Sequence, residues 1–183
     1  DGKKGIKVIP CYYKKDYPEW SDRGDGPGAP VAIHQPNSPV IATGKRDGSK
    51  IRLPNGNYLE ETASYFVMVE TATGGFTPAL ITMKSTQLNV SKKWNSMMKT
   101  TQFPDGKGGF ATPPMFGVVY NLASTLQKND KGSWYGWVVT MDRILGQEDK
   151  SLYLGAKDFG ANVSKGAVQT KSEVEEKSDS TPY

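Results

Sequence analysis

The chain has 183 residues and a formal net charge of +4, and this length suits one domain with a hydrophobic core. A single cysteine, Cys11, excludes an intramolecular disulfide, and with a single histidine, His34, no zinc site of the His/Cys type can be built. No apolar run is long enough for a membrane-spanning helix, so no membrane association is expected. Twenty glycines and twelve prolines favour short strands and turns over long helices.

The first half of the chain predicts strands separated by turn-rich segments. Asn55-Gly56 tolerates the positive φ of a two-residue turn and predicts a hairpin with short strands over residues 51–59. A segment rich in Gly, Pro and Asp predicts a loop over residues 21–30, and the prolines of residues 31–41 indicate irregular structure. Alternation of apolar with other residues predicts the remaining strands of this half, residues 5–13, 63–71 and 78–84.

The second half predicts a helix and a long hairpin. Apolar residues at helical spacing predict a helix over residues 85–99, with Trp94 on its apolar arc. A Gly/Pro loop over residues 102–114 follows. The other predicted elements are two strands that form a hairpin, residues 115–126 and 133–144, and a short helix over residues 152–163.

These elements predict a mainly β fold. Six or so strands with one mid-chain helix suit an OB-fold-like barrel of five to six strands, because the helix of that fold interrupts the barrel between its third and fourth strands. A C-terminal helix could complete it, and a β-sandwich is the alternative. Residues 1–164 form the single domain of this prediction. Residues 165–183 lack core-forming residues and are expected to be a disordered, acidic tail.

The sequence offers little for catalysis. His34 is the only histidine available to a Ser-His-Asp triad, and no nucleophile elbow lies near it. Gly44-Lys45 lacks the other residues of a phosphate-binding loop. A metal-dependent nuclease could use Glu60, Glu61 or Glu70, but no acidic pair with a following lysine stands on a predicted central strand. We therefore expect no enzyme, no catalytic residue, no cofactor and no metal, and keep the nuclease as an alternative.

Aromatic residues interleaved with lysine and arginine are the strongest functional signal. Every nucleobase has a π face on which an exposed ring can stack, and cations neutralise the phosphates. The body of the chain carries +6, because residues 169–183 carry −2. The pattern predicts a surface that binds single-stranded nucleic acid. Its candidate residues are Tyr12, Tyr13, Lys14, Lys15, Trp20, Arg46, Lys50, Arg52, Lys84, Lys92, Lys93, Trp94, Trp134, Tyr135 and Trp137.

The hydrophobic core competes for some of these rings. Trp94 lies on the apolar arc of its helix, which favours a place in the core over a contact. One of Trp134 and Tyr135 must face inward, because strand neighbours point to opposite faces. Trp20, among polar and charged neighbours, is the best candidate for an exposed ring. A lectin-like or protein-binding surface would also use exposed Tyr and Trp.

Four segments carry a resemblance to a known family. They are residues 8–13 (with Glu19-Trp20 and Arg23-Gly24 after them), 53–58, 83–88 and 91–95. Lys84-Ser85-Thr86-Gln87 and Lys93-Trp94-Asn95 are the most distinctive stretches. Over residues 5–160 the chain resembles proteins carried in the replication modules of tailed phages. Several of these proteins look like single-stranded-DNA-binding proteins.

The resemblance implies a protein that coats single-stranded DNA without sequence preference during phage replication or recombination, in the cytoplasm of the infected bacterium. Such proteins pair an OB-fold with an acidic tail through which they contact phage DNA polymerase, helicase or nuclease. The alternatives are a structural virion or assembly protein and the nuclease. The sequence does not determine the oligomeric state, and a homo-oligomer is one of the states considered. The corresponding tail residues are Glu173, Glu175, Glu176, Asp179 and Tyr183.

Overall fold

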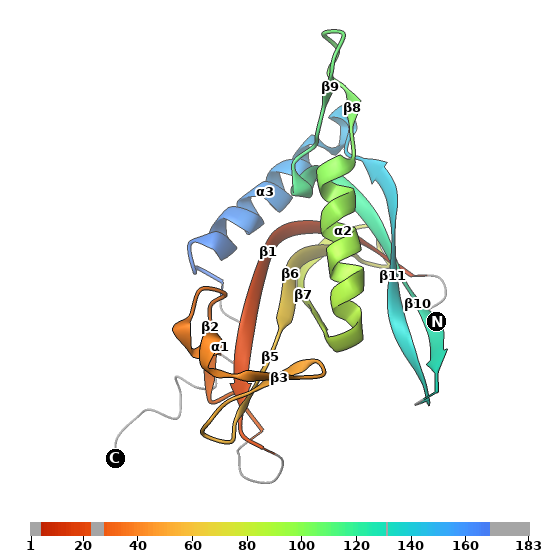
Figure 1. Ribbon diagram of the computed structural model, residues 1–183. Coiled ribbons are helices and arrows are strands. Elements are labelled where there is room, and N and C mark those ends of the chain that lie inside the picture. The colour runs from red at the N-terminus through yellow and green to blue at the C-terminus, as the bar shows by residue number, and fades with distance from the viewer. Residues whose placement is uncertain (1–4, 23–27, 131, 169–183) are drawn as a thin grey trace.

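The computed structural model describes residues 5–22, 28–130 and 132–168. Its main feature is a strongly curled antiparallel sheet with the strand order β7-β6-β1-β10-β11 (Figure 1). β1 lies at the centre, between β6 and β10. The strands are β1 (Ile6–Trp20), β6 (Thr62–Glu70), β7 (Phe76–Lys84), β10 (Val118–Asn129) and β11 (Gly132–Ile144).

The second half of β1 also belongs to a smaller sheet. Its last residues pair with β2 on one side and with β5 on the other, and the sheet continues through β4 to β3. The hairpin predicted over residues 51–59 is confirmed, but residues 53–57 rather than a two-residue turn connect β4 to β5, and Gly56 in this connection has a φ of 90°. The elements are β2 (Ala32–His34), α1 (Pro39–Thr43), β3 (Lys45–Asp47), β4 (Lys50–Arg52) and β5 (Tyr58–Glu60).

Helix α2 (Leu88–Thr100) lies in the hollow of the curled sheet (Figure 1). A short 3-10 turn, η1 (Ser85–Gln87), leads into it from β7, so the helix predicted over residues 85–99 is confirmed, with a tighter first turn. Gln87 also reaches the other edge of the sheet, where its Oε1 accepts a hydrogen bond of 3.0 Å from the backbone N–H of Trp137 in β11. η1 therefore bridges the two edge strands, β7 and β11, of a half-barrel.

Trp94 holds α2 on the sheet. Its side chain has no exposed surface and stacks on Tyr65 of β6, with 4.3 Å between the ring centroids. The same ring meets Tyr120 of β10 edge-on at 5.6 Å. The hydroxyl of Tyr65 is itself tied to α2, because it shares a hydrogen bond of 2.7 Å with the hydroxyl of Ser91. The apolar arc of α2 is thus the centre of the main core.

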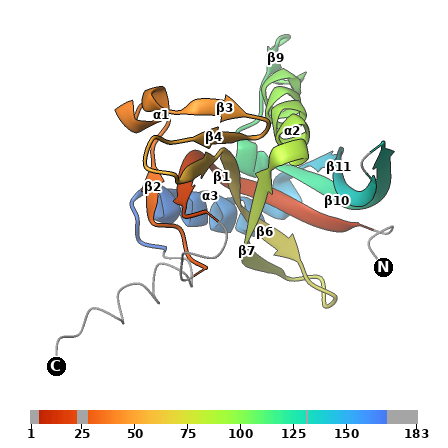
Figure 2. The same cartoon turned by 60° about the horizontal axis from the view of Figure 1, so that its bottom comes forward.

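Helix α3 (Lys150–Ser164) covers the opposite face of β1 (Figure 2). Successive β1 residues face the two helices in turn, so that Val8 belongs to the core under α2 and Ile9 to the core under α3. Gly160 of α3 packs so closely on β1 that a Cβ there would collide with the carbonyl oxygen of Cys11. Burial raises the pKa of the Cys11 thiol to about 12, which is typical of a structural cysteine.

The structure confirms a mainly β fold with one mid-chain and one C-terminal helix. Three segments differ from their prediction. β1 extends beyond residues 5–13 to Trp20, residues 31–41 contain β2 and the start of α1, and residues 102–114 contain a small hairpin. The remaining elements are β8 (Phe103–Pro104), β9 (Phe110–Ala111) and the 3-10 turns η2 (Met115–Gly117) and η3 (Gln147–Asp149).

A buried carboxylate joins β1 to the smaller sheet. Glu19 is 7 % exposed and accepts hydrogen bonds from Asn57 Nδ2 (2.6 Å), His34 Nε2 (2.7 Å) and Asn55 Nδ2 (3.1 Å). These hydrogen bonds, that of Asn57 first and that of His34 next, stabilise the ionised form and lower the pKa of Glu19. The only histidine of the chain therefore fastens β2 to β1.

Glu19→Gln should lower the free energy of unfolding by about 1–3 kcal/mol near neutral pH, because an amide cannot accept all three hydrogen bonds. The folded state favours the ionised carboxyl, so the contribution of Glu19 is present above the pKa of the unfolded chain and is lost as the pH falls through the lowered folded pKa. Urea unfolding near pH 7 and near pH 3 measures the difference between native protein and variant. We expect that difference to shrink at the lower pH, and a constant difference would contradict the role of Glu19.

Candidate nucleic-acid interface

Ion pairs engage most of the cations predicted on β1, β4 and β7. A lysine or arginine that already faces a carboxylate gains less from a phosphate, because the existing pair must be broken or shared. These residues are weaker candidates than their sequence positions indicate. The pairs are Lys14 with Asp16 (3.1 Å), Lys15 with Glu61 (2.6 Å), Arg52 with Asp22 (3.1 Å) and Asp47 (3.4 Å), and Lys84 with Glu60 (3.0 Å).

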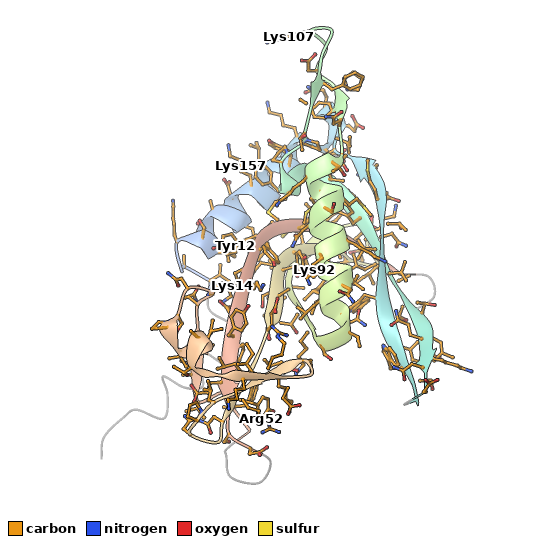
Figure 3. The ribbon with its side chains drawn as sticks, in the orientation of Figure 1. Tyr12, Lys14, Arg52, Lys92, Lys107 and Lys157 are labelled. Carbon is orange, nitrogen blue, oxygen red and sulfur yellow. The ribbon has the colours of Figure 1, made fainter. Side chains whose placement is uncertain are left out.

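Three lysines of α2 differ from these. Lys92, Lys93 and Lys99 are exposed, and none of them forms an ion pair with another residue of the described structure. Lys92, Asn95 and Lys99 follow one another at spacings of three and four residues, so they share one side of the helix, whereas Lys93 lies on another side (Figure 3 labels Lys92). Lys99 is absent from the predicted set, although its spacing from Lys92 could have identified it.

A pocket of about 380 Å³ lies on this side of α2, against β1. Tyr13 of β1 lines it together with Met98 and Met115, whose flexible side chains adapt to a flat ring. Asn95 and Lys99 add an amide and a cation. Apolar walls with a few hydrogen-bonding groups and one cation suit a nucleobase with its phosphate. The lining is completed by Thr112 and Pro113.

A second pocket, of about 330 Å³, lies on the other side of α2, against the β10–β11 hairpin. It brings together two predicted residues, Lys93 and the half-buried Trp137. Trp94 also borders this pocket, but its side chain has no exposed surface. Of the two roles considered for Trp94, the structure has the core position that its helical arc favoured, since the ring is already packed against Tyr65 and Tyr120.

The outer end of the β10–β11 hairpin presents an exposed ring. Tyr135 is 70 % exposed and lies across from Leu126, which is exposed as well. The preceding residue, Trp134, is half-buried, and its enclosed indole nitrogen has no hydrogen-bond partner among the described residues. Of these two neighbours Trp134 is the more buried, and Tyr135 is the ring that is free to stack on a base.

Tyr12 and Lys14 lie on a different face from the pockets. Tyr12 contacts Phe66 of β6 with 6.1 Å between the centroids, and the ammonium group of Lys14 lies 5.9 Å from the centre of the same ring. Tyr13, the next residue of β1, points the other way into the pocket beside α2. The basic and aromatic cluster at this end of the sequence is thus divided between the two faces of one strand.

The smaller sheet holds the remaining predicted residues. Arg46 is exposed on β3, and the ammonium group of Lys50 lies 3.6 Å from the ring centre of Tyr58, a cation–π contact. Trp20, expected to be the best exposed ring, is instead half-buried with its indole nitrogen enclosed, because it pairs across from Tyr58 in the sheet. The predicted partner-binding residues between positions 173 and 183 lie outside the described residues.

The carboxylates considered for a nuclease are not brought together. Glu60 and Glu61 face lysines near the start of β6, whereas Glu70 ends that strand. Among the described residues, no group of three His, Cys, Asp or Glu side chains could hold a metal ion. In the same part of the chain, every helix is too short or too polar to span a bilayer.

A comparison with protein-family models shows a match over most of the chain. The model described as Pam3 phage gp34-like protein matches residues 2–169, which include α2, both pockets and the hairpins beside them. No curated protein and no solved structure matches the chain.

Proposed function

The chain belongs to the Pam3 phage gp34-like protein family, and we propose that this phage protein binds and coats single-stranded DNA without sequence specificity during phage DNA replication or recombination. It acts as a binding protein rather than as an enzyme, in the cytoplasm of the infected bacterium. Its acidic C-terminal tail recruits phage DNA polymerase, helicase or nuclease.

One observation carries the proposal: exposed lysines that form no ion pair with any described residue lie beside an apolar pocket on each side of α2. Lys99 lines the pocket of Tyr13, with Lys92 on the same side of the helix, and Lys93 lines the pocket of Trp137. Lysines that neutralise phosphates give affinity for any sequence, and pockets accept bases only where these are unstacked. Bases of a duplex remain stacked inside it, so this arrangement favours a single strand.

Fluorescence anisotropy with labelled oligo-dT, a matching RNA and a matching duplex, at low and at moderate salt, tests the proposal. We expect tight binding to the DNA single strand, weaker binding to the duplex, and an affinity that falls as salt rises. The oligonucleotide should stay intact when magnesium is added. Binding that does not prefer single strands would overturn the coating role, and loss of the oligonucleotide with magnesium would favour the nuclease.

Exposed apolar side chains on the edge strands favour a second candidate, a structural virion or assembly protein. Val138 and Met141 of β11 are each 41 % exposed, and so is Leu80 of β7. Edge strands with apolar side chains are places where copies of a chain can pair. A sizing column run without DNA separates the candidates, because an assembly protein forms large oligomers there and the coating protein does not need to.

Tyr135→Ala should weaken binding to oligo-dT by about 1–3 kcal/mol, the contribution of one base stacked on an aromatic ring. Tyr135→Phe is the matched control, since it retains the ring and loses only the hydroxyl. Anisotropy titrations of both variants measure the effect. If Tyr135→Ala binds like the native protein, the outer end of the β10–β11 hairpin does not contact the strand.

A further inference from the structure

The β8–β9 hairpin, residues 103–111, projects beyond the C-terminal end of α2 and is here called the finger (Figure 1). Its turn is held by Asp105, whose Oδ1 accepts hydrogen bonds from the backbone N–H groups of Lys107 (2.8 Å) and Gly109 (2.9 Å). The backbone N–H of Asp105 donates a further bond of 3.0 Å to the carbonyl oxygen of Gly109. The turn therefore has a defined shape without any ligand.

The finger carries a ring and a cation. Phe110 is 70 % exposed and pairs with Pro104 across the hairpin. Lys107 lies at the outer end (Figure 3), is exposed, and forms no ion pair with the other described residues. A ring beside an unpaired cation is the combination that single-stranded nucleic acid recognises.

The end of the finger that joins the body of the protein lies next to the Tyr13 pocket beside α2. Thr112 and Pro113 follow β9 directly and line that pocket together with Lys99, which lies in the last turn of α2. Cations and apolar surface thus continue along one side of the molecule, from Lys92 on α2 through the pocket to the finger. A strand bound beside α2 would leave the pocket at the place where the finger begins.

We propose that the finger extends the DNA-binding path, with Phe110 stacking on a base next to the nucleotide in the pocket and Lys107 close to a phosphate. The inference rests on the proposed function and adds a contact to it. A phenyl ring stacks on any base, so the finger needs no sequence preference. Because Asp105 already holds the turn, little conformational entropy is lost when the strand binds.

Three substitutions of one residue test the stacking role by anisotropy with oligo-dT. Phe110→Ala and Phe110→Leu should each weaken binding by about 5- to 100-fold, whereas Phe110→Trp should retain it and gain a fluorescence signal that DNA quenches. Leu keeps apolar surface without a π face, so it separates base stacking from an apolar protein contact. Ile33→Ala, which removes another exposed apolar side chain on β2, is the matched control and should bind like the native protein.

Two further variants probe the cation and the turn. Lys107→Gln should lower the dependence of log affinity on log salt by about 0.7, the value for one phosphate contact on a single strand. Asp105→Ala should weaken binding although Phe110 is unchanged, because the turn that positions the ring is released. If native protein binds oligo-dT tightly and the Phe110 variants bind equally well, the finger is not part of the path. If native protein does not bind oligo-dT, the proposed function fails and this inference fails with it.

Discussion

Replacing both Lys92 and Lys99 with Glu should weaken binding to oligo-dT on the order of 100-fold at low salt. The salt dependence should also become shallower by about 1.4 in log–log units, because each phosphate contact on a single strand contributes about 0.7. Both lysines lie on the side of α2 that borders the Tyr13 pocket, and neither has a carboxylate partner to lose within the described structure. Anisotropy titrations over a series of salt concentrations measure both quantities.

Lys157 and Lys165 supply the control for that double substitution. Lys157 lies on α3 (labelled in Figure 3) and Lys165 at its C-terminal end, and this helix lies across β1 from α2 (Figure 2). Both are exposed, and neither forms an ion pair with another described residue. Changing both to Glu alters the net charge by the same amount as the substitution on α2. We expect only a small loss from this long-range effect. Equal losses from both double variants would mean that net charge, and not the surface of α2, determines binding.

Trp94→Ala should reduce the free energy of unfolding by about 3–5 kcal/mol, the range for removal of a large buried aromatic side chain. The ring fills the centre of the main core, stacked on Tyr65 and in edge contact with Tyr120, and α2 has no comparable anchor on the sheet. Urea unfolding followed by circular dichroism measures the loss. Trp94→Phe should cost less, since it retains one ring against Tyr65.

The same pair of variants separates the core role of Trp94 from the contact role that the sequence suggested. If Trp94 stacked on DNA from an exposed position, Trp94→Ala would retain most of the stability and lose affinity, because it removes the ring. We expect the reverse: a measurable loss of stability, with affinity for oligo-dT close to that of the native protein under conditions where the variant is folded. Unchanged stability of Trp94→Ala would contradict the packing described above.

Local patterns in the sequence predicted the elements of the fold better than their pairing. The arc of α2 and the β10–β11 hairpin depend on residues close together in the chain, and both are confirmed. The second half of β1 was missed, because Lys14-Lys15-Asp16 has no apolar alternation. That half is held by pairing with β6, β2 and β5, which lie far along the chain.

The sequence predicted which residue types form the candidate site, but not which of the individual lysines and rings belong to it. Lys15 and Lys84 look like Lys92 in the sequence, yet they face Glu61 and Glu60 in the structure, and such pairs depend on strand register. Lys99 has a local signal, its helical spacing from Lys92. Phe110 has no such local signal, because the sequence of its segment is typical of a loop. The small hairpin that forms there places its ring in an exposed position.

The shared strand β1 has a consequence for how the molecule opens. Its first half lies between β6 and β10, and its last residues lie between β2 and β5. The strands of one sheet therefore cannot come apart at β1 without disturbing the pairing of the other sheet. Amide hydrogens at both ends of β1 should therefore exchange with solvent only through a common, nearly global opening. Amides at the outer ends of the β8–β9 and β10–β11 hairpins, which have no such double support, should exchange through fast local opening. The two hairpins can then adjust to a bound strand while the frame that carries them stays closed.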